Sequence, residues 1–543
     1  MRVLIQMRYT HELSTALTTP RLSTAAVSPI MVPGFSLDEN YIPVKLSKRV
    51  IRERVRDMEV GRLFTFDARP EVSTYLIRGE VEDDASLSRL VERVQSDPNV
   101  AGVFSDPKIS AIAVCPQNPV GSHEEVSNLL EVSKLHSRGM DGSNVMVAIV
   151  DTGINLDYLR NKGINPGFDA GKSWTPVPGL IPGSMPVDHG TMCAFDVCIA
   201  APNCTLLDYA LLQSQEEGGT AMEGFLSDAV KAYSKLLDLL STEGQPKPAL
   251  IVNNSWGMFH PSWDFPVGHP GNYSDNPDHP FNIIVESLED AGADILFAAG
   301  NCGSECPDGR CSGVTDRAIY GANSHKDVLC VGGVTVNKVR LGYSSQGPGR
   351  LQQDKPDLCA YTHFKGSDVY SADGGTSAAC PVAAGIVAAI RSVYSPANLT
   401  PAQLRNLLRR TSEDIGLVGF DYSHGFGIIS VPGILGALDQ REIRQVRIGE
   451  TVSGNLKETN ATAMFKIKTG NALNIVLDGP QGVDFDIYVR RGAEPTIKEY
   501  DYRGYTGSAD EKIRIQPMEP GEYYVMVRSY RGAGDFSLKA TLE

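Results

Sequence analysis

Between residues 120 and 437, short apolar runs alternate with segments of helical periodicity, and this alternation constrains the fold more than any other feature of the chain. The helical segments include GFLSDAVKAYSKLLDLL and FNIIVESLEDAG, and the apolar runs are NVMVAIVD, TLLDYALL, ALIVNNS, DILFAAG and DVLCVGGV. Strands separated by helices predict βαβ units, which build a mostly parallel sheet with helices on both faces. We therefore predict an α/β fold here, with functional residues at the carboxyl ends of the strands.

The patterns on either side of this segment are different. Residues 1–112 combine strand-like runs with one helical stretch around 86–96, which predicts a small α+β domain. Residues 443–543 contain only short alternating strands, among them VDFDIYVRR and GEYYVMVRSY, punctuated by Gly, Pro and Asp. That pattern is typical of an all-β sandwich. The chain is therefore predicted to comprise three domains, at 1–112, 120–437 and 443–543.

Charge and composition narrow the range of functions. The chain has 543 residues, 42% of them apolar, and a formal net charge of -15. Phosphate binding needs a basic surface, so we expect no nucleic-acid partner. The longest apolar runs are shorter than a bilayer span requires, so we expect no membrane span. The first residues lack the apolar core of a secretory signal, which favours a cytoplasmic location, with secretion by another route as the alternative.

Four polar residues lie where predicted strands end or predicted helices begin. Asp151 follows the run VMVAIV, and Asn301 follows LFAAG. His189 opens the helical segment HGTMCAFDV, and Ser377 lies at the start of TSAACPVAAG. Each of them alone is a common turn or helix-capping residue. Together they meet the needs of acyl transfer.

Acyl transfer by a serine requires a base, an acid and fixed hydrogen-bond donors. The hydroxyl of Ser377 needs an adjacent base such as His189, and that base needs an acid such as Asp151 to hold its tautomer. The oxyanion of the tetrahedral intermediate needs donors, which the Asn301 amide and the Ser377 backbone N–H can supply. We therefore predict that these four residues are catalytic.

The order Asp, His, Ser in these local settings resembles the subtilisin-like serine proteases, the subtilases. The blocks VAIVDTGI, HGTMCA, NNSWG, FAAGN, YSSQGP, KPDL and GGTSAACPVAAG carry the resemblance over residues 145–390. It implies a triad of Asp151, His189 and Ser377, with Asn301 in the oxyanion hole. It also implies two walls of a substrate groove, formed by Ser255-Trp256-Gly257 and by Ala298-Ala299-Gly300.

The flanking domains extend the resemblance. Residues 1–112 resemble the inhibitory propeptide of subtilases, which implies an autoprocessed zymogen whose extended tail lies in the groove and is cut in cis within 112–122; a retained accessory domain is the alternative. Residues 443–543 resemble the β-sandwich pre-peptidase C-terminal domains of secreted bacterial peptidases. The implied function is a serine endopeptidase acting on proteins or peptides, with its own N-terminal domain as intramolecular inhibitor. No cofactor is expected for the chemistry, and structural calcium with unidentified ligands is an expected addition.

Other functions fit the sequence less well or stay open. An aspartic protease needs two Asp-(Thr/Ser)-Gly turns, and only the one at residue 151 is present. The stretch HELST at 11–15 lacks the second histidine of a zinc-protease helix. Nothing marks one of the ten cysteines as a catalytic thiol. A peptide ligase or macrocyclase on the same scaffold, and a catalytically idle binding protein, remain as alternatives.

A cysteine-rich stretch, NCGSECPDGRC, begins at Asn301. It contains Cys302, Cys306 and Cys311. Three interpretations stay open for these cysteines: a disulfide or redox-sensitive loop, a zinc site completed by a ligand from elsewhere, and plain thiols. We expect the insertion to shape the substrate pocket beside Asn301.

Overall fold

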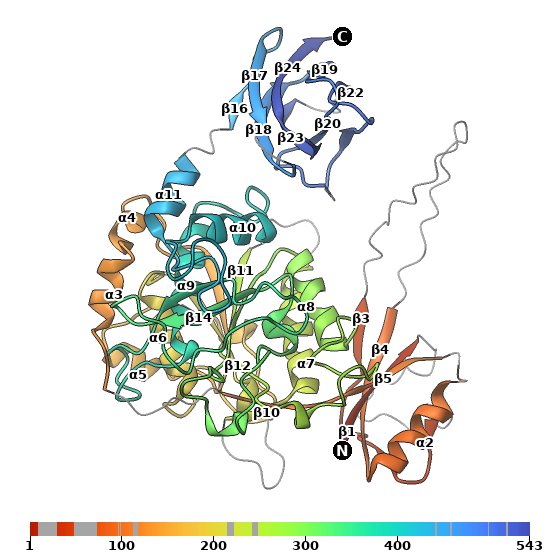
Figure 1. The fold of residues 1–543 in the computed structure, drawn as a ribbon, viewed down its shortest axis with the longest axis vertical. Helices are drawn as coiled ribbons and strands as arrows, with labels where there is room; N and C mark the ends of the chain where they lie inside the picture. Colours follow the sequence, from red (N-terminus) through yellow and green to blue (C-terminus); the bar gives the residue numbers. More distant parts are fainter. Residues whose placement is uncertain are drawn as a thin grey trace. The chain divides into compact units, whose positions relative to one another are not determined.

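The computed structural model (Figure 1) describes residues 1–8, 30–47, 73–95, 97, 99–111, 118–213, 222–241, 248–439, 443–456, 459–497, 499–516 and 520–543. These residues form two compact units. The first comprises Met1–Val393 and Pro401–Val431, and the second comprises Tyr394–Thr400 and Pro432–Glu543. The predicted N-terminal and central domains therefore share one unit. The predicted domain boundaries lie at or near segments outside the described residues and stay predictions.

The N-terminal part of the first unit is an antiparallel sheet packed against a helix. Its strands are β1 (Arg2–Arg8), β2 (Phe35–Leu37), β3 (Val44–Ser47), β4 (Ser73–Val81) and β5 (Val100–Ser105), in the order β2-β4-β1-β5 with β3 also on β4. Helix α2 (Asp84–Gln95) contributes Leu90 and Val94 to a buried core that also contains Val3 and Ile77. The apolar residues at helical spacing thus face the strands, as the sequence predicted.

The centre of the first unit is a seven-stranded parallel sheet. Its order is β15-β14-β13-β11-β7-β9-β8, and the strands are β7 (Val145–Val150), β8 (Gly167–Phe168), β9 (Thr205–Tyr209), β11 (Ala249–Asn254), β13 (Asp294–Ala298), β14 (Leu329–Val334) and β15 (Leu358–Tyr361). Every residue of β7 and β11 is buried. Because successive side chains of a strand point to opposite faces, both faces of the sheet are covered. The predicted α/β class is confirmed.

Helices surround this sheet (Figure 1). The α-helices are α3 (His123–Leu129), α4 (Val132–His136), α5 (Leu156–Asn161), α6 (His189–Cys198), α7 (Leu226–Leu240), α8 (Pro280–Asp290), α9 (Thr376–Arg391) and α10 (Pro401–Thr411), and the 3-10 helices are η2 (Ala170–Lys172), η3 (Leu211–Gln213), η4 (Pro261–Trp263), η5 (Gly309–Cys311) and η6 (Gly321–Ser324). Helix α9 is buried throughout and packs on α6 and on five strands, β7, β11, β13, β14 and β15. At Gly385 the two helices approach so closely that a Cβ would lie 2.4 Å from the Val197 carbonyl oxygen. The small residues of α9 therefore allow a helix to lie inside the domain.

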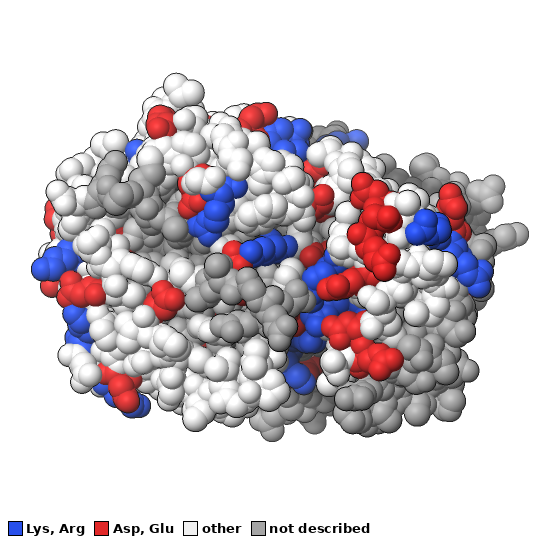
Figure 2. All heavy atoms as spheres, turned by 90° about the horizontal axis from the view of Figure 1, so that it is seen from below, with Lys and Arg blue, Asp and Glu red and all other residues white. Residues whose placement is uncertain are grey.

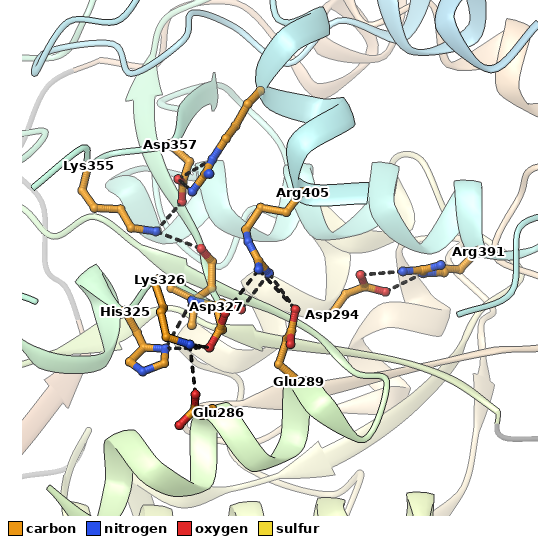
Figure 3. A network of polar contacts seen from close by, with 12 residues as sticks. Glu286, Glu289, Asp294, His325, Lys326, Asp327, Lys355, Asp357, Arg391 and Arg405 are labelled. Carbon is orange, nitrogen blue, oxygen red and sulfur yellow. Dashed lines mark hydrogen bonds and ion pairs between the residues drawn. The ribbon is translucent and has the colours of Figure 1, made fainter. Parts of the chain in front are cut away.

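Two groups of buried ion pairs hold the elements around the sheet (Figure 3). Arg391, the last residue of α9, donates from Nε to Asp294 Oδ2 at 2.6 Å and from Nη2 to Oδ1 at 2.8 Å, which ties α9 to the start of β13. Asp357 accepts from Lys355 Nζ at 2.7 Å and from Arg409 Nε at 2.8 Å. Charges this deeply buried need such partners, because each would otherwise lose its hydration without compensation.

The second unit contains an all-β sandwich preceded by helix α11 (Val431–Asp439). One sheet has the order β16-β18-β23-β20-β21 and the other β17-β24-β19-β22, formed by β16 (Arg444–Gln445), β17 (Thr451–Leu456), β18 (Thr462–Thr469), β19 (Leu473–Asp478), β20 (Asp484–Arg491), β21 (Tyr502–Gly504), β22 (Glu511–Ile515), β23 (Gly521–Arg531) and β24 (Gly534–Leu542). In β22, buried and exposed residues alternate strictly, and Ile513 and Ile515 belong to a hydrophobic core that contains residues from both sheets. That alternation confirms the predicted sandwich.

Acidic and basic side chains are mixed on the surface of the described residues. On the described part of the face drawn in Figure 2, Lys and Arg side chains are interspersed with Asp and Glu. Among the described residues, none of the helices combines the length and the apolar composition that crossing a bilayer needs.

Candidate active site

Asp151 and His189 lie together at the carboxyl edge of the parallel sheet. Asp151 directly follows β7, and His189 is the first residue of α6, whose N-cap is Asp188. The distance between His189 Nδ1 and Asp151 Oδ1 is 2.8 Å, and Oδ1 also accepts from Thr152 N at 2.7 Å. Both side chains are buried, with exposed fractions of 3% for His189 and 0% for Asp151. The contact orients the imidazole so that Nε2 points away from the carboxylate.

This contact also sets the charge preference of the imidazole. Burial opposes the charged form of His189, but the negative charge of Asp151 and its hydrogen bond outweigh that effect, so the pKa of His189 is raised above its ordinary value. His189 Nε2 is buried and has no hydrogen-bond partner among the described residues. An imidazole with a held Nδ1 and an unused Nε2 is arranged as a general base.

Ser377 is the second residue of α9, so its backbone N–H lies at the positive end of a buried helix. The preceding Gly375 has φ +76, a left-handed conformation that glycine adopts without strain, and it turns the chain into the helix. Ser377 Oγ donates to the Ser255 carbonyl oxygen at 3.3 Å, and Ser255 Oγ donates to the Ser377 carbonyl oxygen at 2.9 Å. Ser255 therefore holds the start of α9 in place.

The thiol of Cys193 connects the three predicted triad residues. Its Sγ lies 3.9 Å from Asp151 Oδ2, 3.9 Å from His189 Nδ1 and 3.7 Å from the Ser377 carbonyl oxygen. Burial, followed by the charge of Asp151, raises the pKa of this thiol well above its ordinary value. Cys193 is therefore a neutral packing residue beneath the site, and the structure brings Asp151, His189 and Ser377 into one cluster around it.

Asn301 approaches the same cluster from β13. It follows Gly300, whose φ of +102 requires the conformational freedom of glycine. The Asn301 side-chain oxygen accepts from Thr376 N at 3.0 Å and from Thr376 Oγ1 at 3.1 Å. Thr376 thereby determines which end of the amide faces α9, and Nδ2 is the end directed elsewhere. A donor next to the N-terminus of α9 is the arrangement that an oxyanion hole requires.

A strand from the N-terminal part lies in the groove beside this cluster. β6 (Lys108–Ala111) pairs antiparallel on one side with β10 (Glu223–Phe225) and on the other with β12 (Trp256–Gly257). Ala111 lies opposite Trp256, and Ser110 lies opposite Gly257. An extended peptide bound by its backbone between two edges is the mode expected for a protease substrate. Of the predicted edge, Trp256 and Gly257 thus pair with the chain's own N-terminal segment, while Ser255 bonds to Ser377; substrate binding by these residues stays a prediction.

A pocket opens beside β12. Gly257, Ala299, Gly300 and Asn301 line it, together with Met258, Phe259, Cys302, Ala318, Tyr320 and Asn323. Ala298, which the sequence also assigned to this wall, is buried in β13, and its carbonyl oxygen accepts from Asn323 Nδ2 at 2.9 Å. The lining is apolar or uncharged, which suits an uncharged side chain.

The cysteine-rich stretch forms a closed loop on the far side of the pocket. Cys302 and Cys311 are joined by a disulfide, and Cys306 is disulfide-bonded as well. Thiols in disulfides are not available as zinc ligands, so the first of the three interpretations holds. Asp308 N donates to the Asn301 carbonyl oxygen at 2.8 Å, which joins the loop to the predicted oxyanion residue.

One group of side chains among the described residues has the spacing of a metal site. Donor atoms of Asp151, His189 and Cys193 lie within 4.8 Å of one another. A metal there would occupy the imidazole that acyl transfer needs, and the thiol is held in its protonated form by burial. We therefore interpret the group as a catalytic cluster. The expected calcium stays a prediction, since calcium also draws ligands from backbone carbonyls and water.

Sequence reasoning missed several residues that the structure places at this site. Thr376 orients Asn301, Cys193 packs against the predicted triad, and Asn323 lines the pocket and donates to the Ala298 carbonyl oxygen. Thr376 directly precedes Ser377 and Cys193 lies one helical turn after His189, so their positions in the sequence could have identified them. Arg310 was also missed; it reaches β6 from the disulfide loop.

Comparisons with known proteins agree with this geometry. The sequence profile of the Subtilase family matches residues 142–427, and that of the Bacterial pre-peptidase C-terminal domain matches residues 459–529. Subtilisin DY from Bacillus licheniformis is 28% identical over 310 residues, which cover 56% of this chain and 95% of that protein. An extracellular protease of Xanthomonas campestris pv. campestris is 25% identical over an alignment of 571 residues, covering 96% of this chain and 90% of that protein. Subtilisin E from Bacillus subtilis is 27% identical over 353 residues, covering 63% and 77%.

Proposed function

The chain belongs to the subtilase family, and from that premise we propose that it is a serine endopeptidase whose triad is Asp151, His189 and Ser377. The observation that carries the proposal is the 2.8 Å contact between Asp151 and His189 beside Ser377 at the N-terminus of α9. The relatives that match most of the chain are themselves proteases. Protein or peptide chains are the substrates.

The proposed mechanism assigns one role to each residue. Ser377 Oγ turns from Ser255 toward His189, attacks the scissile carbonyl carbon, and passes its proton to His189 Nε2. Asp151 holds the Nδ1 proton and stabilises the imidazolium. The oxyanion accepts from Asn301 Nδ2 and from the Ser377 backbone N–H. His189 then protonates the leaving amine, and water attacks the acyl-enzyme to release the second product.

We further propose that the N-terminal part is an intramolecular inhibitor removed by autoprocessing. The support is β6, which takes the place of a substrate strand between β10 and β12. The cut proposed within 112–122 follows directly on β6; of these residues, 112–117 lie outside the described ones. The intact chain is then a zymogen, and its tail is both the first substrate and the first product inhibitor.

The test is labelling of the purified chain with a fluorophosphonate, followed by mass spectrometry of the peptide that carries the adduct. We expect one adduct, on Ser377, and its loss in Ser377→Ala. An unlabelled Ser377 in the processed protein would overturn the proposal in favour of an idle binding protein. Sequencing the products of a peptide library separates hydrolysis from ligation, since joined or cyclic products identify a ligase.

A further inference from the structure

We propose that Arg310, presented by the Cys302–Cys311 loop, is a specificity-determining residue that selects substrates with a hydroxyl side chain at the position Ser110 occupies in β6. The inference rests on the proposed function, because it requires a substrate strand to take the place of β6. The substrate class is an extended peptide with serine or threonine at that position, as in the chain's own tail, where Ser110 follows Lys108-Ile109 in β6.

The backbone pairing of β6 leaves selection to the side chains. Ser110 lies opposite Gly257 on one side and opposite Glu223 on the other. Main-chain hydrogen bonds of this kind bind an extended peptide largely without regard to its sequence. Ser110 itself is buried, with an exposed fraction of 3%, so its side chain points into protein. The groups that surround the Ser110 hydroxyl therefore decide which residue fits.

The group that meets this hydroxyl is a guanidinium. Arg310 Nη1 donates to Ser110 Oγ at 2.6 Å, across 200 residues of sequence. A charged donor gives a stronger hydrogen bond than a neutral one. A substrate with alanine here would leave that donor without its acceptor, and a site arranged to bond a hydroxyl discriminates against the analogue that lacks one.

Arg310 is held in position before any substrate arrives. Asp308 Oδ1 accepts from Arg310 N and from Nε, both at 2.9 Å, and Asp308 Oδ2 accepts from Nη2 at 2.8 Å. The guanidinium carbon lies 3.8 Å from the centre of the Phe259 ring. A fork bond and a stacking contact together restrict the side chain, so little freedom is lost when it binds a peptide.

The charge of Arg310 is already balanced, which favours a neutral partner. The Asp308 carboxylate binds one edge of the guanidinium, through Nε and Nη2, and an acidic substrate side chain would approach that carboxylate as well. An alkyl side chain offers no acceptor. A hydroxyl accepts the hydrogen bond without adding charge, so it fits better than either.

The loop provides the rigidity that this contact needs. Asp308 is the N-cap of η5, which ends at Cys311, and the disulfide from Cys311 returns to Cys302 in the pocket wall. The loop thereby fixes Arg310 relative to Asn301. A peptide bound by Arg310 is therefore also held at a defined position relative to the proposed oxyanion donor. This gives the cysteine-rich insertion a role in substrate choice.

The test measures kcat/KM of the processed enzyme on quenched-fluorescence peptides of residues 106–124, which span the whole proposed cleavage range and differ only at position 110. For the wild type we expect serine to exceed alanine by about 10-fold, with aspartate no better than alanine, because a hydrogen bond to a partly solvated charged donor is worth about one factor of ten. In Arg310→Ala the serine and alanine peptides should be cut equally, at the rate of the wild type on alanine.

A matched control removes another stacked arginine beside the pocket. Arg350 lies 5.4 Å from the Tyr320 ring, and its other contacts run to Arg317 and Asp275. Arg350→Ala should keep the wild-type ratio of serine to alanine. Arg310→Lys keeps the positive charge but lacks the planar guanidinium that binds Asp308 and the hydroxyl together, so most of the preference for serine over alanine should be lost. A serine preference that survives in Arg310→Ala, or an equal loss on both peptides, overturns the inference.

A second measurement needs no turnover and separates this inference from the proposed function. In the full chain carrying Ser377→Ala, hydrogen exchange of the β6 amides should speed up in Ser110→Ala and in Arg310→Ala, and the two effects should be less than additive in the double variant, since both remove the contact between these side chains. Additive effects overturn the inference. If β6 shows the coupling but the wild type cuts no peptide, the proposed function is wrong and the Arg310 contact stands.

Discussion

The first unit contains two buried polar clusters that use the same kinds of group in opposite ways. In the cluster at Asp357, one carboxylate oxygen accepts from Cys330 N at 2.6 Å and Lys355 Nζ at 2.7 Å, and the other accepts from Arg409. In the cluster at Asp151, the carboxylate is bonded to His189, but the far nitrogen of that imidazole has no partner among the described residues.

The difference separates a polar group that holds the fold from one that is kept for chemistry. An unpaired buried polar atom costs free energy, so the surrounding structure must stabilise it. The Asp357 cluster shows how completely this fold can satisfy a buried charge when stability is the only requirement. Other buried polar atoms also lack a partner among the described residues, Asp196 Oδ1 and Trp256 Nε1 among them, so the unused Nε2 of His189 marks the site only together with the carboxylate held at Nδ1.

Asp151→Asn should have the largest effect on activity. The amide can still accept from Thr152 N, but it no longer holds the tautomer of His189, so kcat should fall by about 10⁴-fold. The carboxylate also raises the pKa of His189, so the acidic limb of the kcat/KM profile should lie above its ordinary position in the wild type and move to lower pH in the variant. Measuring kcat and kcat/KM for peptide hydrolysis across the range from about pH 4 to 10, in both proteins, checks both expectations.

Asp188→Asn is the control for this variant. Asp188 accepts from His189 N and from the Tyr370 hydroxyl but does not contact the imidazole ring. We expect kcat to stay within the same order of magnitude. Equal losses in the two variants would contradict a special role for Asp151.

Asp357→Ala should have the opposite effect from Asp151→Asn, with a large loss of stability and little loss of activity. It leaves the ammonium of Lys355 and the guanidinium of Arg409 without their common partner, so the free energy of unfolding should fall by about 3–5 kcal/mol. Activity measured well below the unfolding temperature should change little. Denaturant unfolding of the inactive Ser377→Ala background avoids self-digestion.

The exposed ion pair between Lys338 and Glu413 supplies the control. Glu413→Ala should lower the free energy of unfolding by less than about 1 kcal/mol, because solvent screens exposed charges. If the two variants cost the same, the contrast between buried and exposed pairs in this domain is wrong.

Asn301→Ala should reduce kcat by about 10²–10³-fold with little change in KM, the scale known for the corresponding donor in a related subtilisin. Asn301→Asp sharpens the interpretation, since it retains an acceptor for Thr376 but no donor for the oxyanion. We expect a loss at least as large as for alanine. An active aspartate variant would mean that Asn301 only positions α9.

The smallest effect is expected for the double variant Cys302→Ser with Cys311→Ser. Opening the loop frees Arg310 from its fixed position, so the preference for serine at position 110 should shrink from about 10-fold toward equality. The rate on the alanine peptide should stay close to that of the wild type. A reducing agent should lower the preference of the wild type at least as far, because it opens the disulfide of Cys306 as well as the Cys302–Cys311 bond.

The fold could be predicted from the sequence to the extent that local patterns decide it. β7 is buried throughout and is an unbroken apolar run, and β11 is also buried throughout and starts with four apolar residues before its two asparagines, whereas buried and exposed residues alternate along β22. These two patterns separate a covered parallel sheet from a sandwich. Asp151 and Asn301 could be singled out because they follow strands, and His189 and Ser377 because they lie at the start of helices; their catalytic roles stay predictions.

Contacts between distant segments could not be predicted in this way. Arg310 and Ser110 are 200 residues apart, and Asp357 and Arg409 are 52 apart. The sequence left three interpretations open for the cysteines, because pairing depends on where the loop returns in space. The resemblance implies that Ala298 belongs to the pocket wall; the structure places it as the buried last residue of β13, and its role in substrate binding stays a prediction.

The sequence by itself determined which elements form and which residue types stand at their ends, since helical and strand periodicities and the Asp, His and Ser motifs are local properties. Only the tertiary structure decided which of those ends meet, which nitrogen of His189 is bonded to a carboxylate, and which arginine contacts the strand in the groove. The physical reason is that hydrogen bonds and ion pairs act over a few ångströms. A chain must be folded before residues far apart in sequence come within that range.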